Sequence, residues 1–169
     1  MSTQQKGDAP AVVFIGPMGA GKTRVGRRVA RLIGTGFTDT DKLIVAEHGS
    51  IGSIFAEHGE AYFRELERAA VVRALEGWGV VSLGGGAVLD PATRADLAGH
   101  RVVLLTVSPE AVEPRLADGK RPLVKNGLAD WQRIYAERRP IYEQLADLEI
   151  DTSHRPYDGI ATEVAEWLK

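Results

Sequence analysis

Short apolar runs recur along the chain and are separated by segments in which apolar residues return every three or four positions. The longest runs are Ala11–Ile15, Val80–Leu83 and Val102–Val107. Runs of this length and composition are typical of strands that are buried on both faces of a sheet. Two shorter candidates, Phe37-Thr38 and Leu148–Ile150, extend the same pattern. We therefore expect a strand at each of these places.

Segments with helical spacing lie between these candidate strands. Apolar residues recur at intervals of three and four between Val25 and Ile33. Asp90-Pro91 and Ser108-Pro109 each combine an N-cap residue with a proline at the first helical position, which predicts two helix starts. Strands that alternate with helices argue for an α/β fold with a parallel sheet between helices. Further helices are expected at about 50–76, with a break near His58-Gly59, at about 131–145 and at about 157–168.

Length and composition narrow the class of protein. A chain of 169 residues suits one compact domain, which we place at 11–169. Residues 1–10 are polar and lack the apolar stretch of a signal peptide, so we expect a disordered tail. No apolar run approaches the length of a membrane span, and a net charge of −2 gives no basic field for nucleic acid or anionic lipid. The chain has no cysteine, which excludes disulfides and thiol catalysis. We expect a cytoplasmic monomer.

The sequence of residues 16–23, GPMGAGKT, matches the phosphate-binding loop pattern G-x-x-x-x-G-K-[ST] at every fixed position. It follows a candidate strand and precedes a candidate helix, as a phosphate-binding loop requires. A glycine-rich turn that binds nothing would not need this setting. Glycines let successive N–H groups point at an anion, and the helix adds the positive end of its dipole. Lys22 can reach the β- and γ-phosphates, and Thr23 can ligate Mg²⁺. The loop therefore predicts binding of ATP.

Two other clusters follow candidate strands, and all three should meet at the carboxyl edge of the sheet. Asp39 and Asp41 flank one threonine, and in an extended segment their side chains would point the same way. They could hold Mg²⁺ and accept a hydroxyl proton, or they could only cap the next helix. Gly84-Gly85-Gly86 could only bend the chain, or it could leave backbone amides bare for a small polar ligand.

Arginines supply a third set of candidates. Arg64 and Glu67 lie three apart on a helix, and Arg64 follows Phe63, so an arginine fork beside an apolar ring could clamp a carboxylate. Arg121 lies in the polar stretch 117–130, which we expect to be a mobile lid. It could be merely solvated there, or it could meet a transferring phosphoryl group. Of Arg138 and its neighbour Arg139, helical reasoning alone leaves open which one faces a cleft.

Taken together, these motifs resemble the shikimate kinase family, which are small-molecule kinases with a phosphate-binding loop and a fold like that of nucleoside monophosphate kinases. The resemblance spans about residues 11–165. It rests on six blocks in order: GPMGAGKT at 16–23, FTDTD at 37–41, SIFAEHGEAYFRELE at 53–67, SLGGGAV at 82–88, KRPLV at 120–124 and ERRPIYEQLA at 137–146.

The resemblance implies a three-layer fold with a five-stranded parallel sheet, flanking helices and a lid. It implies transfer of phosphate from ATP to the 3-hydroxyl of shikimate, giving shikimate 3-phosphate and ADP in aromatic amino-acid biosynthesis. Two other functions stay open. The chain could phosphorylate another small hydroxy acid, such as gluconate, or a nucleoside monophosphate, or it could be a nucleotide-binding module without catalysis.

Matching positions also imply a role for each candidate residue. The catalytic residues would be Lys22, Asp41 and Arg121. Nucleotide would be bound by Gly19, Ala20, Gly21, Lys22, Thr23, Arg24, Arg115, Arg121 and Arg155. Shikimate would be bound by Asp41, Phe55, Phe63, Arg64, Gly84, Gly85, Gly86 and Arg138, so the resemblance selects Arg138 over Arg139. Glu67 would brace the site by pairing with an arginine, and Thr23 and Asp39 would lie near Mg²⁺.

Overall fold

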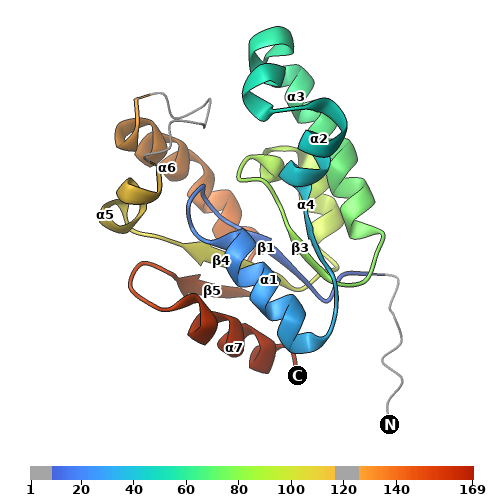
Figure 1. The fold of residues 1–169 in the computed structure, drawn as a ribbon, viewed down its shortest axis with the longest axis vertical. Helices are drawn as coiled ribbons and strands as arrows, with labels where there is room; N and C mark the ends of the chain where they lie inside the picture. The colour runs from blue at the N-terminus through green and yellow to red at the C-terminus, as the bar shows by residue number, and fades with distance from the viewer. Residues whose placement is uncertain (1–8, 117–125) are drawn as a thin grey trace.

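The computed structural model describes residues 9–116 and 126–169. Its centre is a sheet of five strands in the order β2-β3-β1-β4-β5, and every neighbouring pair is parallel. The strands lie where the apolar pattern predicts them, so the α/β class and the parallel sheet are confirmed (Figure 1). They are β1 (Val12–Ile15), β2 (Phe37–Asp39), β3 (Val80–Ser82), β4 (Val102–Thr106) and β5 (Leu148–Asp151).

Helices cover both faces of this sheet and make the fold three-layered (Figure 1). The α-helices are α1 (Lys22–Ile33), α2 (Thr40–His48), α3 (Ile51–Leu75), α4 (Pro91–Leu97), α5 (Pro109–Val112), α6 (Leu128–Leu145) and α7 (Tyr157–Trp167). Two short 3₁₀ helices are η1 (Ala87–Leu89) and η2 (Glu113–Leu116).

The sheet separates two apolar cores. Along β1, Val12 and Phe14 belong to the core beneath α1 and α7, whereas Val13 and Ile15 belong to the core beneath α3 and α4. This alternation is the period of two that a strand imposes on its side chains. Both sets are almost fully buried, which explains why β1 reads as an uninterrupted apolar run. The sheet is thereby fixed from both sides, and its carboxyl edge can carry a site of stable geometry.

The segment after β2 differs from its prediction. Asp41 was expected in an extended stretch, but it lies in the first turn of α2. The carboxylate of Asp39 accepts the N–H groups of Asp41 at 2.9 Å and Lys42 at 3.3 Å, and so acts as the N-cap of this helix. A side chain that satisfies two otherwise unpaired helical donors favours a helix start over a longer strand.

The break in the long helix lies where it was predicted, whereas the bounds of the tail and of the polar stretch 117–130 differ from the prediction. Gly59, with φ 83° and ψ 175°, interrupts α3 where a break is expected near His58-Gly59. The expected lid at 117–130 lies largely outside the described residues, as do Arg121 and residues 1–8. The last part of that range, 128–130, is the start of α6, three residues before the predicted helix start at about 131. Pro10, placed in the tail, is already buried.

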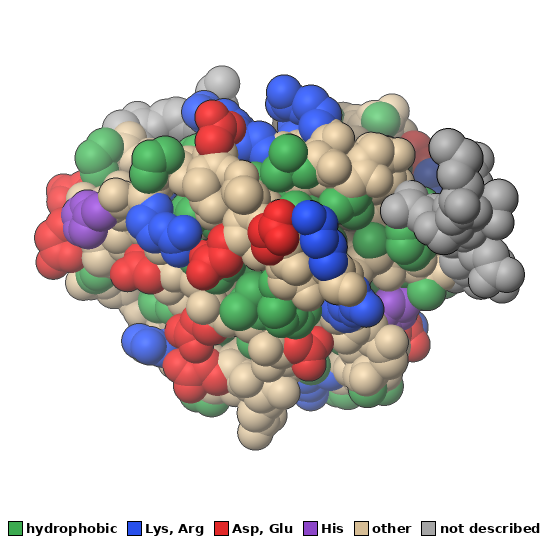
Figure 2. Space-filling view, turned by 90° about the horizontal axis from the view of Figure 1, so that it is seen from below, with side chains coloured by type: hydrophobic (Ala, Val, Ile, Leu, Met, Phe, Trp, Pro, Cys, Tyr) green, Lys and Arg blue, Asp and Glu red, His purple; other side chains and the backbone are tan. Residues whose placement is uncertain are grey.

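The surface mixes charges of both signs. On the face shown in Figure 2, acidic and basic side chains are interspersed, in keeping with the net charge of −2. Within the residues that the structure describes, no helix combines the length and apolar character needed to cross a membrane.

Candidate active site

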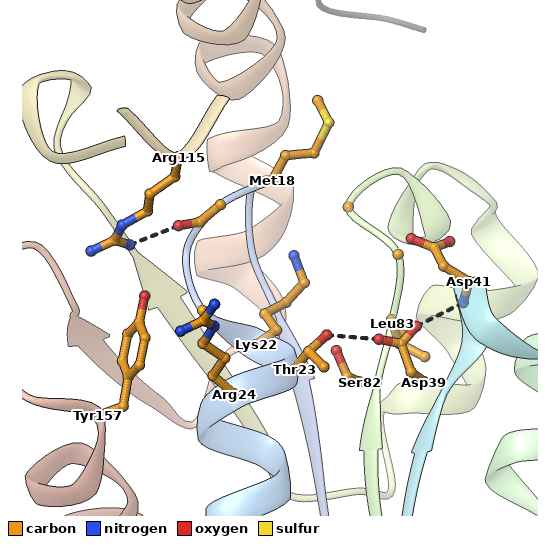
Figure 3. Close-up of a pocket in the computed structure, with 14 residues that line it drawn as sticks. Met18, Lys22, Thr23, Arg24, Asp39, Asp41, Ser82, Leu83, Arg115 and Tyr157 are labelled. Atoms are coloured by element: carbon orange, nitrogen blue, oxygen red, sulfur yellow. Dashed lines mark hydrogen bonds between the residues drawn. The ribbon is translucent and has the colours of Figure 1, made fainter. Parts of the chain in front are cut away.

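A cavity of about 580 Å³ lies where β1, β2 and β3 end (Figure 3). All three clusters that follow strands in the sequence contribute to it, as the topology predicts. The lining comprises Met18, Gly19, Gly21, Lys22, Thr23, Arg24, Asp39, Asp41, Ser82, Leu83, Gly84, Gly85, Arg115 and Tyr157.

The glycine loop wraps one end of the cavity. Gly19 and Gly21 have φ values of 77° and 96°, a left-handed backbone that other residues rarely adopt. Lys22 begins α1, and its Nζ donates to the carbonyls of Gly16 at 2.6 Å and Pro17 at 3.0 Å. The ammonium therefore lies over the loop and beside the helix N-terminus, where an anion is stabilised.

Thr23 and Asp39 connect this loop to the next strand. Thr23 Oγ1 donates to Asp39 Oδ2 at 2.7 Å, while Asp39 Oδ1 caps α2 (Figure 3). Both interpretations of Asp39, as a cap and as a site residue, are therefore compatible. The described residues contain no group of three or more metal-ligating side chains. A hydroxyl beside one carboxylate nevertheless suits Mg²⁺, which is commonly held by one or two carboxylates and substrate phosphates.

Two carboxyl groups lie close to Gly84: Asp41, which is half-buried and lines the cavity, and Glu67, which is buried outside its lining. The pKa of Asp41 is raised to about 6, first by burial and then by the charge of Asp39, while Lys22 and Arg64 oppose the shift. Burial likewise raises the pKa of Glu67 to about 7, against the lowering effect of Arg64. Both groups would therefore exchange protons near neutral pH, as acid–base groups in enzymes commonly do.

Gly84 separates these carboxyl groups. A Cβ added here would lie 2.6 Å from Asp41 Oδ1 and 2.9 Å from Glu67 Oε2. The N–H of Gly84 donates to Thr40 Oγ1 at 3.0 Å, and the Thr40 side chain is fully buried. The backbone at Gly84 thus fills the space between the two carboxyls and has no room for a side chain.

We expect Gly84→Ala to lower kcat by about ten-fold or more, because the added methyl group would push Asp41 away from its position. Steady-state kinetics would measure the change. Gly159→Ala is the matched control, since a Cβ at that exposed glycine meets nothing within 4 Å. Equal kinetics for the two variants would contradict the close packing of Asp41 on Gly84.

Arg64 is held beside the glycine triad by acidic partners and a ring. Its Nη1 donates to Glu67 Oε1 at 2.7 Å, and its Nη2 donates to Glu60 Oε1 at 3.3 Å. The guanidinium lies 5.3 Å from the ring centre of Phe63, which in turn lies 5.0 Å from that of Phe55. Arg64 Nε is buried and has no partner among the described residues. An oriented guanidinium with a spare donor can bind a carboxylate.

The two neighbouring arginines of α6 have different surroundings. Arg138 is 6% exposed, and its Nη1 lies 3.4 Å from the position of a Cβ on Gly85. Arg139 is exposed and pairs with Glu143 at 2.7 Å. Arg138 therefore faces the glycine triad, and Arg139 faces the surface.

Not every candidate residue reaches the cavity. Six of the candidates are outside the lining of this cavity: Phe55, Phe63, Arg64, Glu67, Gly86 and Arg138. Ala20 is buried beneath the loop. Arg155 is exposed and pairs with Glu163 at 2.9 Å, away from the lining.

Ser82, Leu83 and Tyr157 line the cavity but are not among the sequence-predicted site residues. Ser82 and Leu83 end β3, and the rule that strand ends form sites could have found them. Tyr157 packs so closely that a Cβ on Gly21 would lie 2.8 Å from its ring, and Arg115 lies 5.7 Å from the ring centre. Since these residues are far apart in the chain, no local pattern indicates their contact.

Comparisons with known proteins agree with this geometry. The family model described as shikimate kinase matches residues 18–169. Shikimate kinase of Streptomyces coelicolor is 46% identical over 151 residues, which cover 87% of this chain and 88% of that protein.

Solved structures show the same likeness. Shikimate kinase from Acinetobacter baumannii in complex with shikimate is similar with a TM-score of 0.87 and 31% identity, covering 95% of this chain and 92% of that one. A gluconokinase from Sinorhizobium meliloti has a TM-score of 0.62 and 20% identity, covering 95% and 92%. The second likeness indicates a shared fold alone.

Proposed function

The chain belongs to the shikimate kinase family, and from this premise we propose that its cavity transfers phosphate from ATP to the 3-hydroxyl of shikimate. The products are shikimate 3-phosphate and ADP, in the pathway to aromatic amino acids. One observation carries the assignment: Lys22 and Asp41 share a cavity lined by Gly84 and Gly85, and Arg64 and Arg138 lie next to the same glycine triad.

ATP would lie along the glycine loop. The N–H groups of the loop, the start of α1 and Lys22 would bind its phosphates. Arg24, Arg115 and Tyr157 line the same cavity and would face the nucleoside end. Only the family resemblance assigns Arg155 to the nucleotide, since its side chain pairs with Glu163 outside the lining. Thr23 and Asp39 would hold Mg²⁺, which when bound neutralises charge on the β- and γ-phosphates.

Shikimate would lie against the glycine triad, within reach of Asp41 and of the two arginines. Its carboxylate would pair with Arg64 and Arg138, its ring would contact Phe55 and Phe63, and Glu67 would hold Arg64 in place. The 3-hydroxyl would then approach Asp41. The oxygen of the 3-hydroxyl would form a bond to the γ-phosphorus while the bond from that phosphorus to the bridging oxygen of ADP breaks. The proton of the 3-hydroxyl would pass to the Asp41 carboxylate. The family resemblance assigns Arg121, from outside the described residues, to the transferring phosphoryl group.

We expect Arg64→Ala and Arg138→Ala each to raise the KM for shikimate by about 10- to 100-fold, since each would lose a charge-assisted hydrogen bond to the carboxylate. The KM for ATP should change little, because neither arginine lines the nucleotide cavity. Arg139→Ala is the matched control, as its side chain is exposed on the same helix. An unchanged KM for shikimate in both variants would rule out this clamp.

A coupled assay of ADP release with several acceptors tests the function itself. We expect turnover with shikimate and none with gluconate or nucleoside monophosphates, and phosphorus NMR of the product should place the phosphate on the 3-hydroxyl. Turnover only with gluconate would replace the substrate. Binding of ATP without transfer to any acceptor would instead indicate a nucleotide-binding module.

We also propose a cytoplasmic monomer as the working form.

A further inference from the structure

Three successive carbonyl groups on the rear of the glycine loop are each held by a side chain from a distant part of the chain. The donors come from the first turn of α6, from η2 and from the residue that follows β5. The bonds are Trp131 Nε1 to the Met18 carbonyl at 2.9 Å, Arg115 Nη1 to the Gly19 carbonyl at 2.7 Å and Thr152 Oγ1 to the Ala20 carbonyl at 2.7 Å.

Because a peptide group is planar, a bond that fixes a loop carbonyl also fixes the direction of the N–H group of the next residue. In a trans peptide the carbonyl of one residue and the N–H of the next point in opposite directions. The described residues contain no cis peptide bond. A fixed Met18 carbonyl therefore directs the N–H of Gly19, and a fixed Ala20 carbonyl directs the N–H of Gly21. Both of these glycines line the cavity.

The middle bond has a different consequence. The peptide that Arg115 holds directs the N–H of Ala20, which makes a long bond of 3.3 Å to the carbonyl of Pro17. Ala20 itself is buried and is not part of the cavity lining. The two outer donors, Trp131 and Thr152, are thus the ones that orient the amides of residues that line the cavity.

Burial makes these two contacts hard to replace. Trp131 is 1% exposed and Thr152 is 0% exposed. Thr152 Oγ1 also lies 3.0 Å from the carbonyl of Thr106, which ties the loop to β4. A carbonyl that lost its donor here would have no ready access to water, and a buried unsatisfied acceptor is costly. The loop would instead change its orientation.

We propose that Trp131 and Thr152 are positioning residues for nucleotide binding, which hold the Met18 and Ala20 carbonyls so that the N–H groups of Gly19 and Gly21 point at the phosphates. The proposal rests on the nucleotide part of the proposed function and is independent of the acceptor. Trp131 lies seven residues before Arg138 on α6, so this helix also joins the nucleotide loop to the carboxylate clamp.

Matched substitutions at Thr152 test the proposal. Thr152→Val keeps the shape and removes the donor, whereas Thr152→Ser keeps the donor. Without shikimate, calorimetry should show an ADP Kd about ten-fold higher for Val and within about two-fold of the parent for Ser. The KM for shikimate should stay nearly constant. Unchanged ADP binding in the Val variant, or an equal loss in Val and Ser, would overturn the proposal.

Amide NMR supplies a second readout that a general loss of stability would not reproduce. Adding ADP to the parent protein should shift the amide protons of both Gly19 and Gly21, as expected for N–H groups that bind phosphate. Thr152→Val should diminish the shift of Gly21 alone, and Trp131→Phe that of Gly19 alone. Parent-like shifts of both amides in both variants, or equal losses at both amides, would overturn the proposal. Because ADP alone is the probe, a failure of shikimate phosphorylation would remain distinguishable.

Discussion

Lys22→Met lowers kcat for phosphoryl transfer by about a thousand-fold or more, because a charged donor aimed at the reacting phosphates is lost. Lys22 Nζ lies within 3.0 Å of two loop carbonyls and faces the cavity. Methionine keeps an unbranched side chain of similar length but carries no charge. The release of ADP with saturating ATP and shikimate is the measurement.

A control separates this effect from a general loss of charge. Lys169→Met removes an exposed lysine at the far end of the chain, and we expect it to leave kcat unchanged. Thermal unfolding should show that Lys22→Met stays folded. A Lys22→Met enzyme that keeps a tenth of the parent rate would contradict the role given to this ammonium.

Asp41→Asn should lower kcat by about a hundred-fold or more, with little change in the KM for ATP. The amide has nearly the same shape as the carboxylate, but it cannot accept the hydroxyl proton. Asp39→Asn is an informative comparison. It should raise the Mg²⁺ concentration needed for half-maximal rate and leave proton transfer intact, because Asp39 Oδ2 bonds to Thr23 Oγ1, the other proposed Mg²⁺ ligand. Equal kcat for Asp41→Asn and the parent would exclude Asp41 as the base.

The pH dependence has a definite sign. Burial raises the pKa of Asp41 in the free enzyme to about 6, so the parent kcat/KM for shikimate should fall as the pH drops below about 6 and the carboxylate becomes protonated. Asp41→Asn should lose this acidic limb. A raised pKa also means that ionised Asp41 opposes folding. The penalty appears as the pH rises from the ordinary aspartate value towards 6, so Asp41→Asn should gain stability at pH 8 more than at pH 4.

The apolar runs and the glycine motif were sufficient to predict the strands and the phosphate-binding loop. The strands are apolar throughout because both faces are covered, and the glycine loop requires a strand before it and a helix after it. Helix α2 was expected only as the next helix after Asp39, without bounds, because its start depends on a cap. The sequence left open whether Asp39 caps that helix or serves the site, and in the structure one carboxylate oxygen caps α2 while the other accepts from Thr23.

The spacing of apolar residues in α6 distinguishes Arg138 from Arg139. The other buried residues of α6 are Trp131, Ile134 and Tyr142, and Arg138 completes their spacing whereas Arg139 does not. An arginine in phase with a buried apolar face indicates an internal partner. By contrast, the donors behind the glycine loop lie about a hundred residues away from it, and only the folded topology brings them there.

The late position of Thr152 and Tyr157 has a consequence for protein synthesis. Every other described contributor to the nucleotide cavity has been translated well before these two residues. Until β5 and α7 emerge and pack, the loop lacks its hold on Ala20 and the cavity lacks its Tyr157 wall. A chain that lacked β5 and α7 would therefore lose both the bond from Thr152 to the Ala20 carbonyl and the Tyr157 side of the cavity.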